Sequence, residues 1–90
     1  MASSFTKDPD AVLDYQFDWS SWLATDETIS TYEITTPTGI TLDSDSNTDS
    51  AVTIWLSGGT NKTNYSIACL ITTNQSRTDE RTIQILVYQL

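Results

Sequence analysis

The stretch Tyr65-Ser66-Ile67-Ala68-Cys69-Leu70-Ile71-Thr72-Thr73, together with residues 82–88, Thr-Ile-Gln-Ile-Leu-Val-Tyr, decides the fold. In the first segment Tyr, Ile, Cys and Ile alternate with Ser, Ala, Leu and Thr, which is the period of a β-strand. Both sets contain apolar residues, so this segment is predicted to be a central strand. Residues 74–77 break the alternation before it resumes at Ile83, and the two segments are therefore predicted to form a long β-hairpin.

Upstream segments predict the remaining strands of a β-sandwich. Residues 13–17 alternate one-sidedly, residues 29–36 are rich in β-branched side chains, and short apolar patterns follow at residues 40–42 and 51–56. Turn signals separate about seven short strands, and no helical period competes with them. The Tyr that opens the late strand is similar to the tyrosine corner of immunoglobulin-like domains. We therefore predict an all-β, immunoglobulin-like β-sandwich of about seven antiparallel strands.

The chain is predicted to form a single domain preceded by an N-terminal arm. Its 90 residues provide one thin core. Residues 1–11 are largely polar, with Phe5 as their one large apolar side chain, and are predicted to be the arm; residues 12–90 are predicted to be the sandwich. Cys69 is the only cysteine, so the domain has no internal disulfide, and folding in a reducing cytoplasm is expected. The sequence shows neither a signal peptide nor a membrane-spanning apolar run.

The charge balance excludes some classes of partner. The formal net charge is −8, and the positive side chains are Lys7, Lys62, Arg77 and Arg81. Nucleic-acid binding requires a basic surface, so no nucleic-acid partner is expected. Binding to an anionic membrane surface is disfavoured for the same reason. A basic protein surface is the more suitable partner.

The acidic stretch at residues 43–50 is interpreted as a solvated loop. Asp43, Asp45, Asn47 and Asp49 occupy alternate positions, as at the start of a calcium-binding loop. The glycine required at the sixth position is replaced by Thr48, and a residue other than glutamate stands at the twelfth. No metal site is therefore predicted.

An enzymatic function is not predicted either. The chain has no histidine, and Cys69 lies in a predicted strand without a neighbouring base. The pairs Asp26-Glu27 and Asp79-Glu80 are interpreted as ordinary solubilising charges at turns and strand ends. No catalytic residue and no cofactor-binding residue is assigned.

Aromatic and basic side chains are the candidates for a partner interface. Trp19 and Trp22 are too close in sequence for both to lie in so small a core, so one is expected to be buried and the other exposed. Arg77 and Arg81 are expected to pair locally or to dock onto an acidic partner. With Phe5 on the arm, these four residues form the predicted interface, and Trp55 could join Trp19 and Trp22 in a sugar-stacking platform.

Several segments resemble one family of phage proteins. They are residues 7–15 (Lys-Asp-Pro-Asp-Ala-Val-Leu-Asp-Tyr), 18–23 (Asp-Trp-Ser-Ser-Trp-Leu), 26–29 (Asp-Glu-Thr-Ile), 55–60 (Trp-Leu-Ser-Gly-Gly-Thr), 65–67, 71–73 and 77–81 (Arg-Thr-Asp-Glu-Arg). Together they resemble the small virion structural proteins of tailed bacteriophages. Usual members carry a glycine in the hairpin turn where Ser76 stands here. The resemblance implies an immunoglobulin-like domain of the phage particle, either on the capsid or at the neck or tail.

Three functions are consistent with these observations. The first, which we favour, is a capsid decoration or cement protein that binds the major capsid protein, with copies of itself as further partners. The second is a neck, head-completion or tail adaptor domain. The third is a module that binds host glycans through Trp and Asn side chains. In the first two, the protein belongs to a virion assembled in the bacterial cytoplasm.

Overall fold

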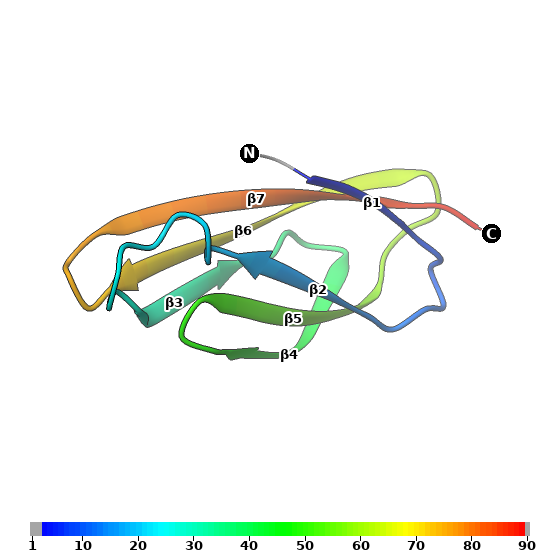
Figure 1. The fold of residues 1–90 in the computed structure, drawn as a ribbon. Coiled ribbons are helices and arrows are strands. Elements are labelled where there is room, and N and C mark those ends of the chain that lie inside the picture. The colour runs from blue at the N-terminus through cyan, green and yellow to red at the C-terminus, as the bar shows by residue number, and fades with distance from the viewer. Residues whose placement is uncertain (1–2, 90) are drawn as a thin grey trace.

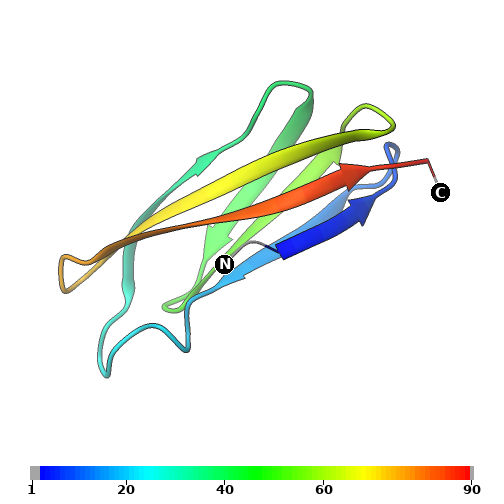
Figure 2. The same cartoon turned by 90° about the horizontal axis from the view of Figure 1, so that it is seen from above.

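The computed structural model describes residues 3–89 as seven β-strands in two sheets (Figure 1). The strands are β1 (Ser3–Lys7), β2 (Leu13–Asp18), β3 (Ile29–Thr35), β4 (Ile40–Asn47), β5 (Ala51–Gly58), β6 (Thr63–Thr73) and β7 (Thr78–Val87). Sheet A has the order β1-β7-β6-β3, and sheet B has the order β2-β5-β4. Figure 2 shows sheet A crossing over the strands of sheet B. The predicted all-β, two-layer architecture is confirmed.

One core fills the space between the sheets, because every second side chain of the strands points inward. In β6 the alternation of buried and more exposed residues runs from Tyr65 to Thr73, as the sequence pattern predicts. Cys69 lies in this core, where burial raises the pKa of its thiol to about 12 and keeps it protonated. The buried residues of this core cluster are Tyr15, Phe17, Trp19, Ile29, Ile40, Val52, Ile54, Leu56, Tyr65, Ile67, Cys69, Ile71, Ile83, Ile85 and Val87.

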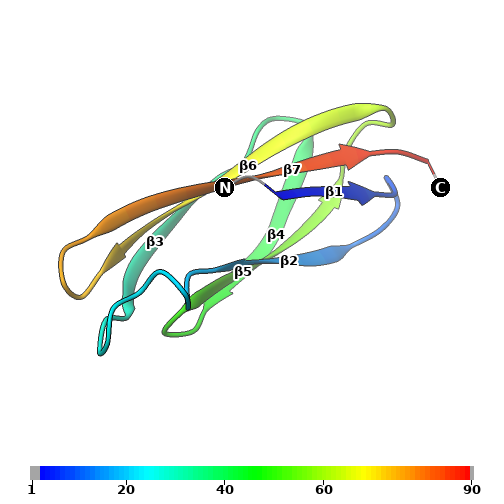
Figure 3. The ribbon, with the colours of Figure 1, turned by 45° about the horizontal axis from the view of Figure 1, so that its top comes forward.

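One strand pair departs from the predicted antiparallel arrangement. β1 pairs with β7 in parallel, in a register that runs from Ser3 opposite Ile83 to Lys7 opposite Val87 (Figure 3). The predicted arm, residues 1–11, thus contains an edge strand of sheet A. The prediction of uniformly antiparallel strands was wrong because alternation defines the faces of a strand and carries no information about the direction of its partner.

The acidic stretch is a strand rather than the predicted loop. β4 continues to Asn47, and only residues 48–50 form the turn to β5. Most of β4 is exposed because it is the edge strand of sheet B, and Asp43 lies at a β-bulge. Charged side chains on an edge strand oppose pairing with other chains. Among residues 3–89, no group of three His, Cys, Asp or Glu side chains is arranged to hold a metal ion.

A side-chain contact joins the two sheets along each open side of the sandwich. On one side the rings of Phe5 in β1 and Tyr15 in β2 lie 4.9 Å apart. On the other side the Tyr32 hydroxyl in β3 donates a 2.6 Å hydrogen bond to the Asp45 carboxylate in β4. This bond to the carboxylate raises the pKa of Tyr32. The edge strands of the two sheets are thereby linked across the core, β1 to β2 on one side and β3 to β4 on the other.

The turn between β5 and β6 provides a test of backbone packing. Replacing Gly59 by alanine is expected to lower the free energy of unfolding by about 2–4 kcal/mol. Its φ is +100°, and an added Cβ would lie 2.6 Å from a methyl carbon of Val87. Gly58→Ala is the matched control, because Gly58 has φ +75° but open space around the added Cβ. This variant is expected to lose about 1 kcal/mol. Urea unfolding monitored by circular dichroism measures both, and equal losses would contradict the predicted clash.

Candidate functional site

Three connections meet at one end of the sandwich, which we call the loop end: residues 19–28, 48–50 and 74–77 (left in Figure 1). Backbone hydrogen bonds join them. Trp19 N donates to Ser50 O over 2.8 Å, and Ile29 N donates to Asp49 O over 2.9 Å. Asn74 N donates to Thr28 O over 3.0 Å. The three segments therefore form one connected surface rather than independent loops.

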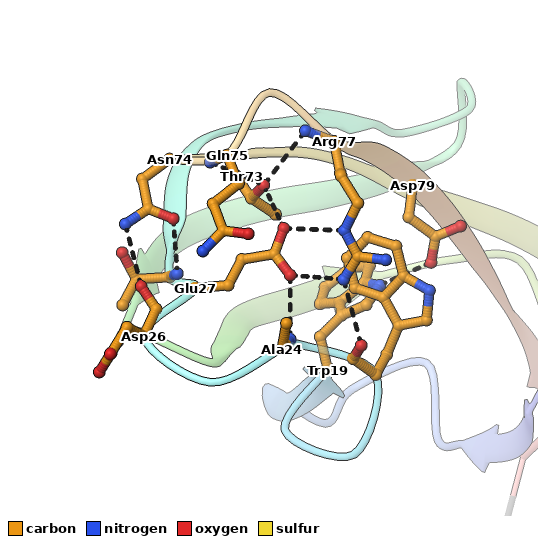
Figure 4. A network of polar contacts seen from close by, with 11 residues as sticks. Trp19, Ala24, Asp26, Glu27, Thr73, Asn74, Gln75, Arg77 and Asp79 are labelled. Atoms are coloured by element: carbon orange, nitrogen blue, oxygen red, sulfur yellow. Dashed lines mark hydrogen bonds and ion pairs between the residues drawn. The ribbon is translucent and has the colours of Figure 1, made fainter.

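Glu27 is the centre of the loop end (Figure 4). Its carboxylate accepts hydrogen bonds from Ala24 N (2.9 Å), from Thr73 Oγ1 (2.6 Å), and from Arg77 through Nε (2.8 Å) and Nη2. The Glu27 side chain has no exposed surface. Hydrogen bonding from Arg77, and then from Ala24 and Thr73, lowers the pKa of Glu27 to about 2. The carboxylate is therefore ionised and fully engaged, and it ties residues 24–27 to the β6–β7 turn.

Arg77 is the solvent-exposed member of this ion pair. Its guanidinium lies 4.0 Å from the centroid of the Trp22 ring, and its Nη2 also donates to Trp22 O over 3.3 Å. The Arg77 side chain is 44% exposed, and Trp22 is partly exposed. Because Glu27 fixes the guanidinium from behind, the stacked Arg77–Trp22 pair is presented to solvent in one orientation.

Trp19 forms the inner wall of the loop end. It has no exposed surface, and its ring stacks against Phe17 with 6.0 Å between the ring centroids. Its indole Nε1 donates a 2.8 Å hydrogen bond to Asp79 Oδ2 (Figure 4). The Arg81 guanidinium lies 5.0 Å from the Trp19 ring and 3.6 Å from Asp79 Oδ2. Asp79 and Arg81, which lie near the start of β7, thus cover the Trp19 ring.

Two turns of the loop end use the left-handed backbone region. Asp26 and Ser76 both have φ of 62°, a conformation that favours glycine. At Ser76 this explains why a glycine suits the hairpin turn. Asn74 supports the other turn, since its Oδ1 accepts from Thr28 N over 3.0 Å and its Nδ2 donates to Asp26 O over 3.3 Å.

The structure brings together four of the five predicted interface residues and separates the fifth. Trp19, Trp22, Arg77 and Arg81 all lie at the loop end. Of the two tryptophans, Trp19 is buried as expected for one of them, whereas Trp22 is only partly exposed and packs against the core. Phe5 lies in β1, is 38% exposed, and lines a hollow on sheet A with Leu86 and Asn64 among others.

The sequence did not indicate that Glu27 and Thr73 belong to the loop end. The local partner expected for Arg77 is also wrong, because Arg77 pairs with Glu27. The interpretation of Glu27 as a solubilising turn charge is wrong, because its side chain is buried and pairs with Arg77, 50 residues away. Arg81 does have the expected local partner, Asp79. No local sequence pattern indicates an ion pair between residues so far apart in the chain. The only indication in the sequence is that the two predicted turns carry opposite charges.

The fold is a β-sandwich, and its loop end presents an aromatic and cationic surface held in place by Glu27. The sequence of residues 7–86 matches the family described as podophage GP4 fiber-tail adaptor protein gp77. Because the match covers most of the chain, the chain belongs to this family. The family is one of structural tail adaptor proteins, so the predictions of a non-enzymatic protein and of localisation in the phage virion are confirmed, and the family places the protein in the tail.

Other comparisons bear on the fold alone. Among solved structures, the chain is similar to the crystal structure of the 2,6-sialyltransferase of Photobacterium sp. JT-ISH-224 in a ternary complex with CMP and lactose. The TM-score is 0.68 and the sequence identity 6%; the match covers 99% of this chain and 18% of the sialyltransferase chain. The search of curated proteins gave no match. In residues 3–89 there is no helix of sufficient length and hydrophobicity to cross a membrane.

Proposed function

We propose that this protein joins a tail fiber to the tail of a podophage virion. The observation that carries the proposal is the match of residues 7–86 to the family of fiber-tail adaptor proteins. The sequence alone favours capsid decoration, with the major capsid protein as partner, over a tail adaptor. The family match favours the tail adaptor and lends no support to a cement protein on the shell.

The loop end is our candidate for one of the two contact surfaces of the adaptor. Trp and Arg are the residue types most often found at the energetic centre of interfaces, and Trp22 and Arg77 present both in a stacked pair. The hydrogen bonds of Glu27 hold this pair before binding, which reduces the entropy cost of association. Trp19 and Arg81 support the surface from the core side, and Phe5 lies on a separate surface.

We also propose that the sandwich is immunoglobulin-like. With the strands named A to G in chain order, β7-β6-β3 corresponds to G-F-C and β2-β5-β4 to B-E-D of immunoglobulin domains. The first strand lies beside the last instead of beside the second. Near the start of β6, the Tyr65 hydroxyl accepts a 2.9 Å hydrogen bond from Thr60 N, the type of contact made by a tyrosine corner.

A phage carrying a stop codon in the gene for this protein tests the proposed function. Particles made without the protein are expected to keep filled heads and to lack tail fibers. Adding the purified wild-type protein is expected to restore fiber attachment, which quantitative mass spectrometry and electron microscopy measure. Trp22→Ala is expected to reduce attachment at least tenfold at equal concentration, because it removes the ring beneath Arg77, whereas Ser21→Ala at the exposed neighbouring position should match the wild type.

Other outcomes point to other functions. Particles that retain their fibers and instead lose shell stability, with the protein present in a copy number close to that of the major capsid protein, would support capsid decoration and overturn the adaptor proposal. Fibers that attach normally but no longer bind host cells would support a glycan-binding module. Thermal unfolding of each variant verifies that Trp22→Ala retains the fold.

A further inference from the structure

Trp55 occupies the middle of the outer face of sheet B. It is 42% exposed, whereas its neighbours Ile54 and Leu56 point into the core with no exposed surface. β5 is the central strand of this sheet, and Trp55 lies in register with Asp14 of β2 and Ser44 of β4. A large indole at this position is not needed by the core, and tryptophan is one of the residue types enriched at the energetic centres of interfaces.

Carboxylates lie on both sides of the Trp55 ring. Asp14 is directly opposite Trp55 on the neighbouring strand. On the other side, the Asp43 carboxylate accepts a 3.0 Å hydrogen bond from Ser57 Oγ, and Ser57 follows two residues after Trp55 on the same face of β5. The outer face of sheet B therefore combines an aromatic surface with negative charge on both flanks.

The cations of the chain are placed elsewhere. Lys7 is buried, and its Nζ donates to Gly58 O (2.8 Å) and Asp8 O (2.9 Å). Arg77 is engaged by Glu27, and Arg81 by Asp79 and the Asp18 carbonyl, both at the loop end. Lys62 lies in the exposed turn between β5 and β6. Within residues 3–89, no hydrogen bond or ion pair joins Asp14 or Asp43 to a cationic side chain; the buried Lys7 lies near enough to Asp43 for this carboxylate to oppose the lowering of the Lys7 pKa by burial.

The loop end contains a complete version of the same arrangement. There the guanidinium of Arg77 lies over the Trp22 ring while the Glu27 carboxylate binds it. At Trp55 the aromatic face and the carboxylates are present, and the cation is the missing component. Arginine suits this position better than lysine because its planar guanidinium stacks on an indole and binds carboxylates through two N–H groups at once.

We propose that the outer face of sheet B, centred on Trp55 with Asp14 and Asp43, docks an arginine-bearing segment of a basic partner protein in the virion. This deepens the proposed function, on which it rests, because an adaptor needs a second contact surface besides the loop end. The loop end closes one extremity of the 43 Å long sandwich, whereas the Trp55 face lies along its side. The two surfaces can therefore be occupied simultaneously by different proteins.

The first test requires no phage component. The full chain, labelled with ¹⁵N, is titrated with a short peptide carrying arginine at three alternate positions, and with the same peptide carrying neutral citrulline instead. We expect the arginine peptide to shift the indole N–H of Trp55 and the amides of β2 and β5 in a saturable manner, and the citrulline peptide to have at least fivefold weaker affinity. Asp14→Asn with Asp43→Asn should weaken binding at least fivefold. Glu33→Gln with Glu80→Gln, which removes the same charge from exposed positions of sheet A, should change it less than twofold.

The second test uses the particles that lack this protein. Trp55→Ala should fold like the wild type, since the ring is exposed on the sheet surface, and should restore at least tenfold fewer fibers at equal concentration. Asp14→Asn with Asp43→Asn, which removes the charges of this face, should give attachment that no longer weakens with added salt as that of the wild type does.

The outcomes of the two tests are distinct. Three results would each overturn the docking face. One is an arginine peptide that shifts the amides around Glu33 and Glu80 as much as those around Trp55. The others are equal affinity of the citrulline peptide and full fiber restoration by Trp55→Ala. Failure of the wild-type protein itself to restore fibers would refute the adaptor function, and the peptide titration would still decide whether the face binds arginine. A Trp55 indole shifted by simple sugars and not by the arginine peptide would identify a glycan surface and also overturn the proposal.

Discussion

Replacing Trp19 by alanine is expected to lower the free energy of unfolding by about 3–5 kcal/mol, the usual cost of truncating a buried aromatic residue. Trp19 is the largest side chain with no exposed surface, and it packs on Phe17. Truncation would also leave Asp79 without the indole N–H and Arg81 without the ring beneath its guanidinium. A domain of this size is stabilised by roughly 5–15 kcal/mol in total, so the variant should be partly unfolded at 37 °C.

A conservative variant separates the packing of Trp19 from its hydrogen bond. Trp19→Phe keeps an aromatic ring against Phe17 and removes the donor to Asp79, so a smaller loss of about 1–3 kcal/mol is expected. Urea unfolding followed by circular dichroism measures both variants, with the slope of the transition as a check of two-state behaviour. If Trp19→Ala unfolded within 1 kcal/mol of the wild type, the tryptophan would not be part of the core.

Replacing Glu27 by glutamine is expected to lower the midpoint of thermal unfolding at pH 7 by roughly 10 °C or more, because it leaves the guanidinium of Arg77 without its buried counter-charge. The loss should depend on pH. The pKa of Glu27 is lowered from 4.5 to about 2 in the folded protein. A lowered folded-state pKa stabilises the fold above the unfolded-state value, and this stabilisation is lost as the pH falls through the folded-state value. The difference between wild type and variant should therefore be full above pH 4.5 and shrink toward pH 2.

Two controls accompany the Glu27 experiment. Glu33→Gln removes the same charge from an exposed position of β3 and should leave the midpoint nearly unchanged. Combining Glu27→Gln with Arg77→Gln should cost less than the sum of the single changes, because the two side chains share one interaction. A difference between wild type and Glu27→Gln that stays constant from pH 7 to pH 2 would rule out the ionised carboxylate as its cause.

The parts of the fold that depend on local alternation could be predicted from the sequence. Tyr65, Ile67 and Cys69 face the core because the strand period alone fixes which side chains share a face. The direction of β1 could not be predicted, since it depends on which strand of a distant segment accepts it. The extension of β4 into the acidic stretch was missed for a related reason, because an edge strand tolerates polar residues that otherwise indicate a loop.

In the candidate site, too, the features that follow from local sequence could be predicted, and those that depend on distant segments could not. The proximity of Trp19 and Trp22 in sequence predicted that one would be buried and one exposed, a consequence of core volume. The position of Glu27 beneath Arg77 arises from the packing of two turns that are distant in sequence. Its burial contradicts the usual preference of glutamate for solvent, and the four hydrogen bonds that compensate for it come from Ala24, Thr73 and Arg77.

The parallel pairing of β1 and β7 determines how the domain carries mechanical load. A force that pulls β1 from its first residue and β7 from its last acts along the strands and slides them past each other. Each of the five register pairs from Ser3–Ile83 to Lys7–Val87 then shares the load, whereas the strands of a hairpin pulled at its open end separate one pair at a time. The edge of sheet A is thus arranged to resist shear between the first and the last strand of the domain.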